Sequence, residues 1–331
     1  MRILLVLLAT GLPLSLAAAN FAYPFSFSPK YQTGEVYMGI RLLGALKLSS
    51  VNAKGELVSE LSDLAWDQDA ELLYAISDEG ALFSFRPTFA DGVLSDLDFV
   101  SKNALRGPSG KRLTGVDADA EGLDLKNARN GVANDTELLV SFERNHRLWR
   151  YDTNGQYLGE IALPKLLQDD AVFRTPNKGL EAFSYHPDGG WITGAEWPLQ
   201  KDDLEHHTLF SASGKHAKVS RYPARRSAVV ALEKLPSNDV LMLERSFDPS
   251  TAAVVIALRK LPNPKDWSSQ KPLPTETLAE FNSFGDWHVD NFEGLTHHQQ
   301  RRYFMVSDDN ENLFQKTLLL YFEVVSTAPK E

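Results

Sequence analysis

The sequence predicts an all-β fold, a β-propeller, and three observations support this. Short apolar runs bounded by Gly, Asp, Asn and Pro recur along the chain, for example at residues 72–76, 138–142, 240–243 and 303–306. Hardly any long stretch has apolar residues at helical spacing. The runs belong to a two-strand phrase whose copies begin about 50 to 60 residues apart, as propeller blades do. A β-sandwich with long loops is the alternative fold.

The N-terminal segment has the pattern of a signal peptide. Arg2 precedes an apolar run at residues 3–9, and small residues follow at Ala17 to Ala19. We expect cleavage after Ala19, with Ala18 as the second choice, so that residues 20–331 form one propeller domain. No later stretch approaches the roughly 20 apolar residues of a membrane-spanning helix. The sequence thus predicts an exported protein, periplasmic or secreted, with no membrane span.

The composition limits the kinds of partner that the protein is expected to bind. The chain has no cysteine, which excludes disulfides and a lipid-anchored lipoprotein, and its formal net charge is −10. This charge argues against nucleic acid or an anionic membrane as a partner and makes cations more natural ligands. We expect a monomer.

Five imperfect copies of the phrase define the blades. In each, a first strand and a polar turn lead to a second apolar strand that ends in an acidic residue. The copies cover residues 61–80, 120–145, 178–197, 228–247 and 291–310. A sixth blade could lie within residues 86–117 or 258–286. We expect residues 39–48 to close the ring by pairing with the C-terminal blade.

Acidic residues recur at matching places in these phrases. Glu121, Glu181 and Glu293 lie in first strands, whereas the acids at the ends of the second strands are Asp78, Glu143, Glu196, Glu244 and Asp308. The fourth phrase lacks the first acid. Since equivalent strand ends of all blades meet at the central channel, we expect these carboxylates to converge.

Converging carboxylates need compensation, because like charges at close range raise one another's pKa. A bound divalent cation is the simplest remedy, and oxygen ligands favour Ca²⁺, or else Mg²⁺, over zinc. The predicted metal ligands are Asp78, Glu121, Glu181, Glu196, Glu293 and Asp308. The alternative is structural, since a strand-end carboxylate can accept backbone N–H bonds from a neighbouring blade.

Basic residues accompany several acids. Arg144 follows Glu143, Arg245 follows Glu244, and Lys178 precedes Glu181. These three cations are candidates for substrate binding, because guanidinium and ammonium groups neutralise phosphoryl oxygens. Pairing of each base with its local acid is the alternative. Adjacent strand residues point to opposite faces, so only one of Glu143 and Arg144 would face the channel unless the strand has ended.

The sequences of these repeats resemble a known family. It is the phytase-like domain described as "esterase-like activity of phytase", which is found in exported bacterial proteins. The matching stretches span nearly the whole mature chain and are residues 61–80, 119–123, 141–145, 177–183, 243–247 and 291–310, followed by 315–317. The resemblance implies phosphoesterase-type activity carried by Glu121, Glu143, Glu181, Glu244, Glu293 and Asp308. A looser similarity to calcium-dependent propeller phytases would imply six blades and Ca²⁺.

Residues and resemblance together predict a hydrolase of a small-molecule phosphoester or ester, with Glu121, Glu143, Glu181, Glu244 and Glu293 as catalytic candidates. We expect calcium at the site and no organic cofactor. Two alternatives remain: a non-catalytic, calcium-stabilised propeller that binds a partner or envelope ligand, and a metal-dependent lactonase or ester hydrolase. A serine-hydrolase elbow and an H-E-x-x-H zinc motif do not occur in the sequence.

Overall fold

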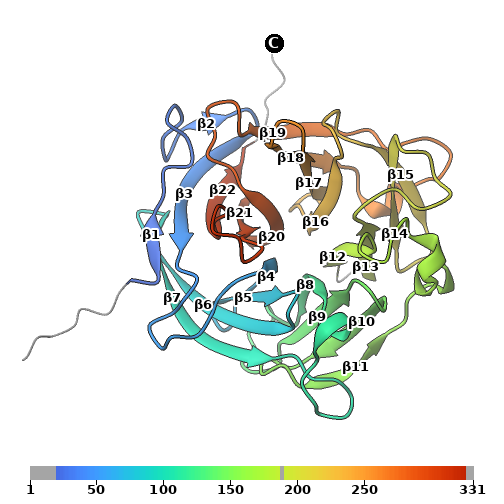
Figure 1. Cartoon of the computed structure of the whole chain (residues 1–331), viewed down its shortest axis with the longest axis horizontal. Helices are drawn as coiled ribbons and strands as arrows, with labels where there is room; N and C mark the ends of the chain where they lie inside the picture. The colour runs from blue at the N-terminus through green and yellow to red at the C-terminus, as the bar shows by residue number, and fades with distance from the viewer. Residues whose placement is uncertain (1–19, 187–189, 326–331) are drawn as a thin grey trace, which may run out of the picture.

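The computed structural model describes residues 20–186 and 190–325, and its strands form five antiparallel sheets arranged around a central axis (Figure 1). The predicted signal peptide, residues 1–19, lies outside the described residues. Blade one contains β4 (Leu61–Asp67), β5 (Leu72–Ser77), β6 (Ala81–Ala90) and β7 (Val93–Ala104). Blade two contains β8 (Ala120–Lys126), β9 (Glu137–Phe142), β10 (Arg147–Tyr151) and β11 (Tyr157–Ile161).

The next two blades repeat this four-strand order. Blade three contains β12 (Leu180–His186), β13 (Gly190–Ala195), β14 (His206–Ser211) and β15 (His216–Ser220). Blade four contains β16 (Ala228–Lys234), β17 (Val240–Asp248), β18 (Ala253–Leu261) and β19 (Glu276–Asn282). Short 3₁₀ turns lie between strands at η1 (Gly115–Asp117), η2 (Lys165–Gln168), η3 (Asp170–Val172) and η4 (Pro264–Asp266).

Blade five joins the two ends of the described chain. It contains β20 (Asn291–Gln299), β21 (Arg302–Asp308) and β22 (Leu318–Val324), and β22 pairs with the N-terminal β3 (Ile40–Leu48). β1 (Ala22–Pro24) and β2 (Val36–Tyr37) pair with β3. The predicted propeller and its closure by N- and C-terminal strands are confirmed, and the β-sandwich alternative is not.

A sixth blade is not found in the described part of the chain. The first region that could have held it supplies β6 and β7, the long outer hairpin of blade one, together with η1. The second region supplies the end of β18 and all of β19, the outer strands of blade four. No helix among the described residues is long and apolar enough to cross a membrane.

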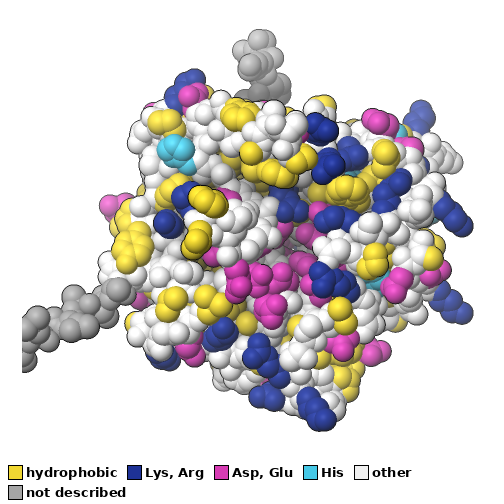
Figure 2. Space-filling view, in the orientation of Figure 1, with side chains coloured by type: hydrophobic (Ala, Val, Ile, Leu, Met, Phe, Trp, Pro, Cys, Tyr) yellow, Lys and Arg dark blue, Asp and Glu magenta, His cyan; other side chains and the backbone are white. Residues whose placement is uncertain are grey.

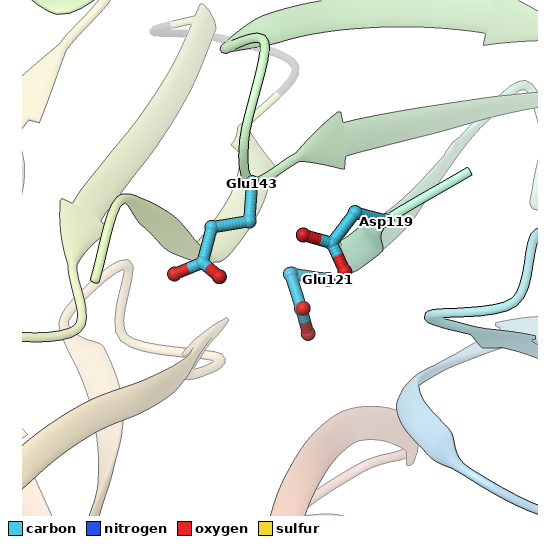
Figure 3. A group of neighbouring side chains, drawn as sticks. All are labelled: Asp119, Glu121 and Glu143. Carbon is cyan, nitrogen blue, oxygen red and sulfur yellow. The ribbon is translucent and has the colours of Figure 1, made fainter. Parts of the chain in front are cut away.

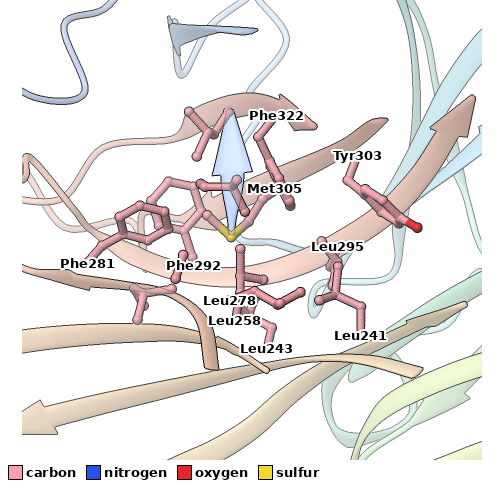
Figure 4. Close-up of a cluster of buried hydrophobic side chains, with 14 of the residues drawn as sticks. Leu241, Leu243, Leu258, Leu278, Phe281, Phe292, Leu295, Tyr303, Met305 and Phe322 are labelled. Carbon is pink, nitrogen blue, oxygen red and sulfur yellow. The ribbon is translucent and has the colours of Figure 1, made fainter. Parts of the chain in front are cut away.

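Apolar side chains fill the space between neighbouring blades. Between blades four and five, Leu243 and Leu258 face Phe292 and Met305 in one buried cluster (Figure 4). Burying each such side chain contributes roughly 1.5–3 kcal/mol to folding. The innermost strands β4, β8, β12, β16 and β20 each contact the next around the ring, and β20 contacts β4. This packing holds the starts of the five inner strands around one axis.

The innermost strand of every blade has a β-bulge at the same place. The residues left out of the strand pairing are Ser62, Glu121, Glu181, Val230 and Glu293. A bulge bends the strand and re-aims the extra side chain, and such bulges are frequent beside active sites. The repeated acids of the first strands therefore lie at bulge positions.

The glycines that follow two of these acids permit close strand approach. A Cβ at Gly122 would lie 2.6 Å from Cβ of Phe183, and one at Gly294 would lie 2.8 Å from Cα of Asp63. Both distances are shorter than real Cβ contacts. This close approach accounts for the identical Glu-Gly-Leu triplets of blades two and five.

Three further acids of the inner strands tie neighbouring blades together. Asp63 Oδ1 accepts the backbone N–H of Leu295 at 3.0 Å, and its Oδ2 accepts that of Leu123 at 2.8 Å. Asp124 accepts the N–H of Tyr185 at 2.6 Å, and Glu233 accepts that of His297 at 2.7 Å. We call Asp63, Asp124 and Glu233 the inter-blade carboxylates. Each links an inner strand to the next by a backbone hydrogen bond.

Candidate functional site

The strand register brings one charged residue from the second strand of every blade to the same end of the channel. In each second strand, this residue directly follows the partner of the residue just before the bulge. In blades one to five it is Asp78, Glu143, Glu196, Arg245 and Asp308. The four acids of this set and the three bulge glutamates form the acidic ring, defined as Asp78, Glu121, Glu143, Glu181, Glu196, Glu293 and Asp308. Figure 2 shows acidic side chains gathered in the central hollow, with basic side chains beside them toward blades three and four.

One expected member of this group, Glu244, is not in the ring. It pairs with Val229, so the next residue, Arg245, takes the ring position of blade four, and Glu244 points to the opposite face of β17. The Glu244 side chain is 1% exposed and contacts Arg259, Ser227 and His207. Burial raises the pKa of Glu244, but His207 and Arg259 outweigh it and lower that pKa to about 2. Glu244 was expected to lie with the other ring acids, but the structure places it on the opposite face of β17, in buried contact with Arg259 and His207.

Carboxylates of blades two and three approach one another closely. Oxygens of Asp119, Glu121 and Glu143 lie within 4.8 Å of one another, and so do those of Glu143, Glu181 and Glu196. Figure 3 shows the first three side chains converging from β8, from the segment before it and from the end of β9. Glu143 belongs to both groups and joins them into one cluster.

Burial and neighbouring negative charges raise the pKa of several ring acids. Burial, together with the charges of neighbouring carboxylates, raises the pKa values of Glu121 and Glu181 well above the usual range. Burial also raises the pKa of Glu143 to about 7, although the Gly179 N–H lowers it, and that of Glu293 to about 8, although Arg245 lowers it. The pKa of Asp78 is raised to about 8 and that of Asp308 to about 6, again mainly by burial.

Several ring oxygens have no hydrogen-bond donor. Glu121 and Glu181 accept no hydrogen bond from any residue that the structure describes, and Asp78 Oδ1 is buried without a partner. A buried carboxylate in this state is costly unless it is protonated or bound to a cation. Oxygen-only ligands in close groups are what Ca²⁺ and Mg²⁺ require. The residues present therefore fit a divalent cation.

The three basic candidates lie at different places. Arg245 donates to Glu196 at 3.0 Å and to Glu293 at 2.7 Å, and Lys178 contacts Glu196. Arg144 lies at the rim, with its side chain 41% exposed and its Nε 3.1 Å from Asp119. Arg245 and Lys178 thus pair with acids of the ring, whereas Arg144 pairs with Asp119 beside it.

Sequence reasoning missed two residues of this site. Burial and the charge of Glu311 raise the pKa of Glu60 to about 7, and Glu60 interacts with Asp78. Asn291 donates to Glu293 at 3.0 Å and to Asp308 at 3.4 Å. The sequence did contain a signal for them. Glu60, Asp119 and Asn291 each lie two residues before the bulge residue of their blade.

Three comparisons relate the chain to known proteins. Residues 56–311 match the sequence model of a family named Phytase-like, described as esterase-like activity of phytase. No curated protein matches. Among solved structures, the Dos1 propeller is similar with a TM-score of 0.35 and 8% sequence identity, over 86% of this chain and 74% of that one.

Proposed function

This chain belongs to the phytase-like family, and from that premise we propose that its acidic ring binds a divalent cation, Ca²⁺ first and Mg²⁺ second, and hydrolyses a phosphoester. The observation that supports this most is the pair of carboxylate groups that share Glu143, with oxygens within 4.8 Å of one another. Glu121 and Glu181 accept no hydrogen bond from the described chain. Such carboxylates are arranged for a cation rather than for the scaffold.

The residues that would hold the cation are those of the two groups, Asp119, Glu121, Glu143, Glu181 and Glu196. Asp78, Glu293 and Asp308 complete the ring and adjust its charge. When bound, the cation would polarise a phosphoryl oxygen and make a water molecule more acidic.

The chain's own residues would bind and orient the substrate. Arg245 and Lys178 lie at the ring and would contact phosphoryl oxygens, since an arginine fork matches two of them at once. These contacts would stabilise the charge that develops during transfer.

A second function from another class has a specific observation in its favour. Arg245 and Lys178 already pair with Glu196, which is the local compensation expected of a structural site. In that case a bound cation would only stiffen the channel, and one face of the propeller would bind a partner or an envelope ligand. Hydrolysis of a carboxylic ester or lactone at the same ring is the third option and agrees with the words esterase-like in the family description.

Turnover on aryl phosphate mono- and diesters and on aryl acetates, with Ca²⁺ or with a chelator, tests the proposal. We expect calcium-dependent phosphoester hydrolysis that falls at least about 100-fold in Glu181→Gln, the size seen when one transition-state contact is removed. Glu121→Gln and Glu293→Gln should behave similarly. Glu137→Gln is the matched control, because Glu137 lies on β9 outside the ring and pairs with Arg150 of β10.

Two results would contradict it. Absence of metal-dependent turnover on every ester would leave the non-catalytic propeller. If Glu181→Gln instead lowered the melting temperature and left the turnover of the folded fraction intact, the ring acids would belong to the scaffold. Turnover confined to aryl acetates would select the ester hydrolase.

We further propose that residues 1–19 are a signal peptide and that the mature chain, beginning at residue 20, is exported as a monomer. Mass spectrometry of the N-terminus and light scattering of the purified protein test this. An intact Met1 on a cytoplasmic protein, or a stable dimer, would contradict the respective part.

A further inference from the structure

Blade four breaks the symmetry of the acidic ring. The other four blades each place at least one acid at the two ring positions, but blade four has Val230 at its bulge and Arg245 at the end of the pairing. Within the described chain, the wall of the channel mouth is thus acidic on four sides and cationic on the fifth. An anionic substrate would approach the ring from this fifth side.

A cavity adjoins the ring on the same side. Its volume is about 710 Å³, within the range of small-molecule sites. It is lined by the ring residue Glu196, by Arg245 at the ring position of blade four, and by apolar and amide side chains. The aromatic residues in its lining are Trp197, Phe247 and Phe314. The cavity therefore shares Glu196 with the acidic ring, and Arg245 lies beside both, so that cavity and ring adjoin.

Two of these aromatic side chains are exposed without an obvious structural reason. Phe247 is 48% exposed and Phe314 is 90% exposed. Leu313 beside Phe314 is exposed as well. Clustered exposed apolar groups next to a polar site mark a binding surface.

The charge of the cavity limits what it can bind. Among the lining residues, Arg226 and Arg245 are the only cations, and Asp290 and Glu196 are acidic. A polyol with many phosphate groups would need several cations in this space, whereas a single phosphoryl group needs only the Arg245 fork. The other lining residues are apolar side chains and the amides Asn291, Asn310, Asn312 and Gln315. None of them carries a charge, so this part of the cavity suits an uncharged group.

From this arrangement we propose that the substrate is an ester of one phosphoryl group with an aryl or bulky alkyl alcohol. The phosphoryl group contacts Arg245 at the ring, and the apolar group lies against Trp197, Phe247 and Phe314. In the reaction a water oxygen forms the new P–O bond, the P–O bond to the alcohol breaks, and the alcohol takes up the proton that water gives up. This inference rests on the proposed function, which places the reaction at the ring.

Binding of two non-hydrolysable probes tests the inference without turnover. Phenylphosphonate and methylphosphonate are titrated into the Ca²⁺-loaded protein by calorimetry, together with inositol hexakisphosphate. We expect phenylphosphonate to bind at least about tenfold tighter than methylphosphonate. Phe314→Ala should remove most of this preference without affecting the fold, because the side chain is almost fully exposed. Phe284→Ala is the matched control, since Phe284 is 70% exposed but does not line the cavity.

The outcomes separate the two proposals. Equal affinity for both phosphonates would overturn the inference. So would tightest binding of the hexakisphosphate with an affinity that Phe314→Ala does not change. In either case, calcium-dependent turnover would still support the proposed function. If phenylphosphonate binds more tightly through Phe314 but the protein shows no turnover, the cavity would be confirmed as a binding site and the proposed hydrolysis would be contradicted. Failure of both phosphonates to bind, with no turnover, would overturn both.

Discussion

The inner strands carry two sets of buried acids that differ in what surrounds their oxygens. The inter-blade carboxylates accept backbone hydrogen bonds, as Asp63 does from Leu123 and Leu295, whereas Glu121 and Glu181 of the acidic ring accept none. Burial raises the pKa in both sets. Burial and pKa alone therefore do not separate a structural acid from a functional one. The presence of fixed N–H donors does, because an acid that lacks them requires a proton or a cation.

Asp63→Ala gives the largest expected effect on the structural side of this comparison. The N–H groups of Leu123 and Leu295 would each lose a buried acceptor, at about 1–3 kcal/mol each. We expect a loss of roughly 3 kcal/mol or more in the free energy of unfolding, measured with a chemical denaturant. The loss should be the same with and without Ca²⁺. Recovery of stability on adding calcium would mean that Asp63 acts with the ring.

Glu244→Gln tests the corrected position of Glu244. The change would leave the buried Arg259 without its counter-charge, and breaking a buried pair typically costs about 3–5 kcal/mol. The pKa of Glu244 is held at about 2, so the loss should persist across neutral pH. Calcium affinity of the folded variant should match that of the unchanged chain. A variant that is stable but has lost calcium affinity would indicate that Glu244 belongs to the cation site.

The acidic ring predicts a pH-dependent response to calcium. The pKa values of Asp78 and Glu293 are raised to about 8, above their usual values near 4, so the folded state keeps protons that the unfolded state has lost. Stability without metal should therefore fall as the pH rises from about 4.5 to 8. Calcium displaces these protons, so its stabilisation should be larger at pH 8 than at pH 5.

Melting temperatures at pH 5, 6.5 and 8, with and without Ca²⁺, check this. At a calcium concentration of about 100 times the dissociation constant, binding should add roughly 2.7 kcal/mol. An equal calcium shift at pH 5 and pH 8 would contradict the raised pKa values of the ring. Glu137→Gln should show the same profile as the unchanged chain.

Arg144→Ala gives the smallest expected effect. The Arg144 side chain is 41% exposed, so its pair with the buried Asp119 should contribute at most about 1 kcal/mol to stability, and turnover should change less than tenfold. Removal of Arg245, in contrast, should reduce turnover strongly, because its guanidinium lies inside the ring. Kinetics of Arg144→Ala and Arg245→Met side by side measure the difference. Equal losses in both variants would place Arg144 at the substrate.

The blades and most of the ring could be predicted from the sequence because their signals are local. Each phrase contains its own hairpin, and the acids at Glu121, Glu181 and Glu293 recur at one position within it. Family membership, predicted from the same phrases, is confirmed by the match to residues 56–311. Metal binding, catalysis and export stay predictions.

The choice between Glu244 and Arg245 could not be made from the sequence. The Glu-Arg pairs of blades two and four look identical, but β9 ends at Phe142, before Glu143, whereas β17 continues through Glu244 to Asp248. A shift of one residue in a strand moves a side chain to the other face. Likewise, the partners of Asp63 lie on β8 and β20, and no local pattern reveals contacts so distant in sequence.

Calcium titration calorimetry at pH 8 tests the central claim most directly, with the unchanged chain, the double variant Glu121→Gln/Glu181→Gln and the control Glu137→Gln. We expect the unchanged chain and the control to bind Ca²⁺ with a dissociation constant of about 1 mM or lower. The double variant should bind at least about 100-fold more weakly while its melting temperature without metal is equal or higher. Calcium affinity that is unchanged in the double variant, or absent from the unchanged chain, would contradict the assignment of the acidic ring as a cation site.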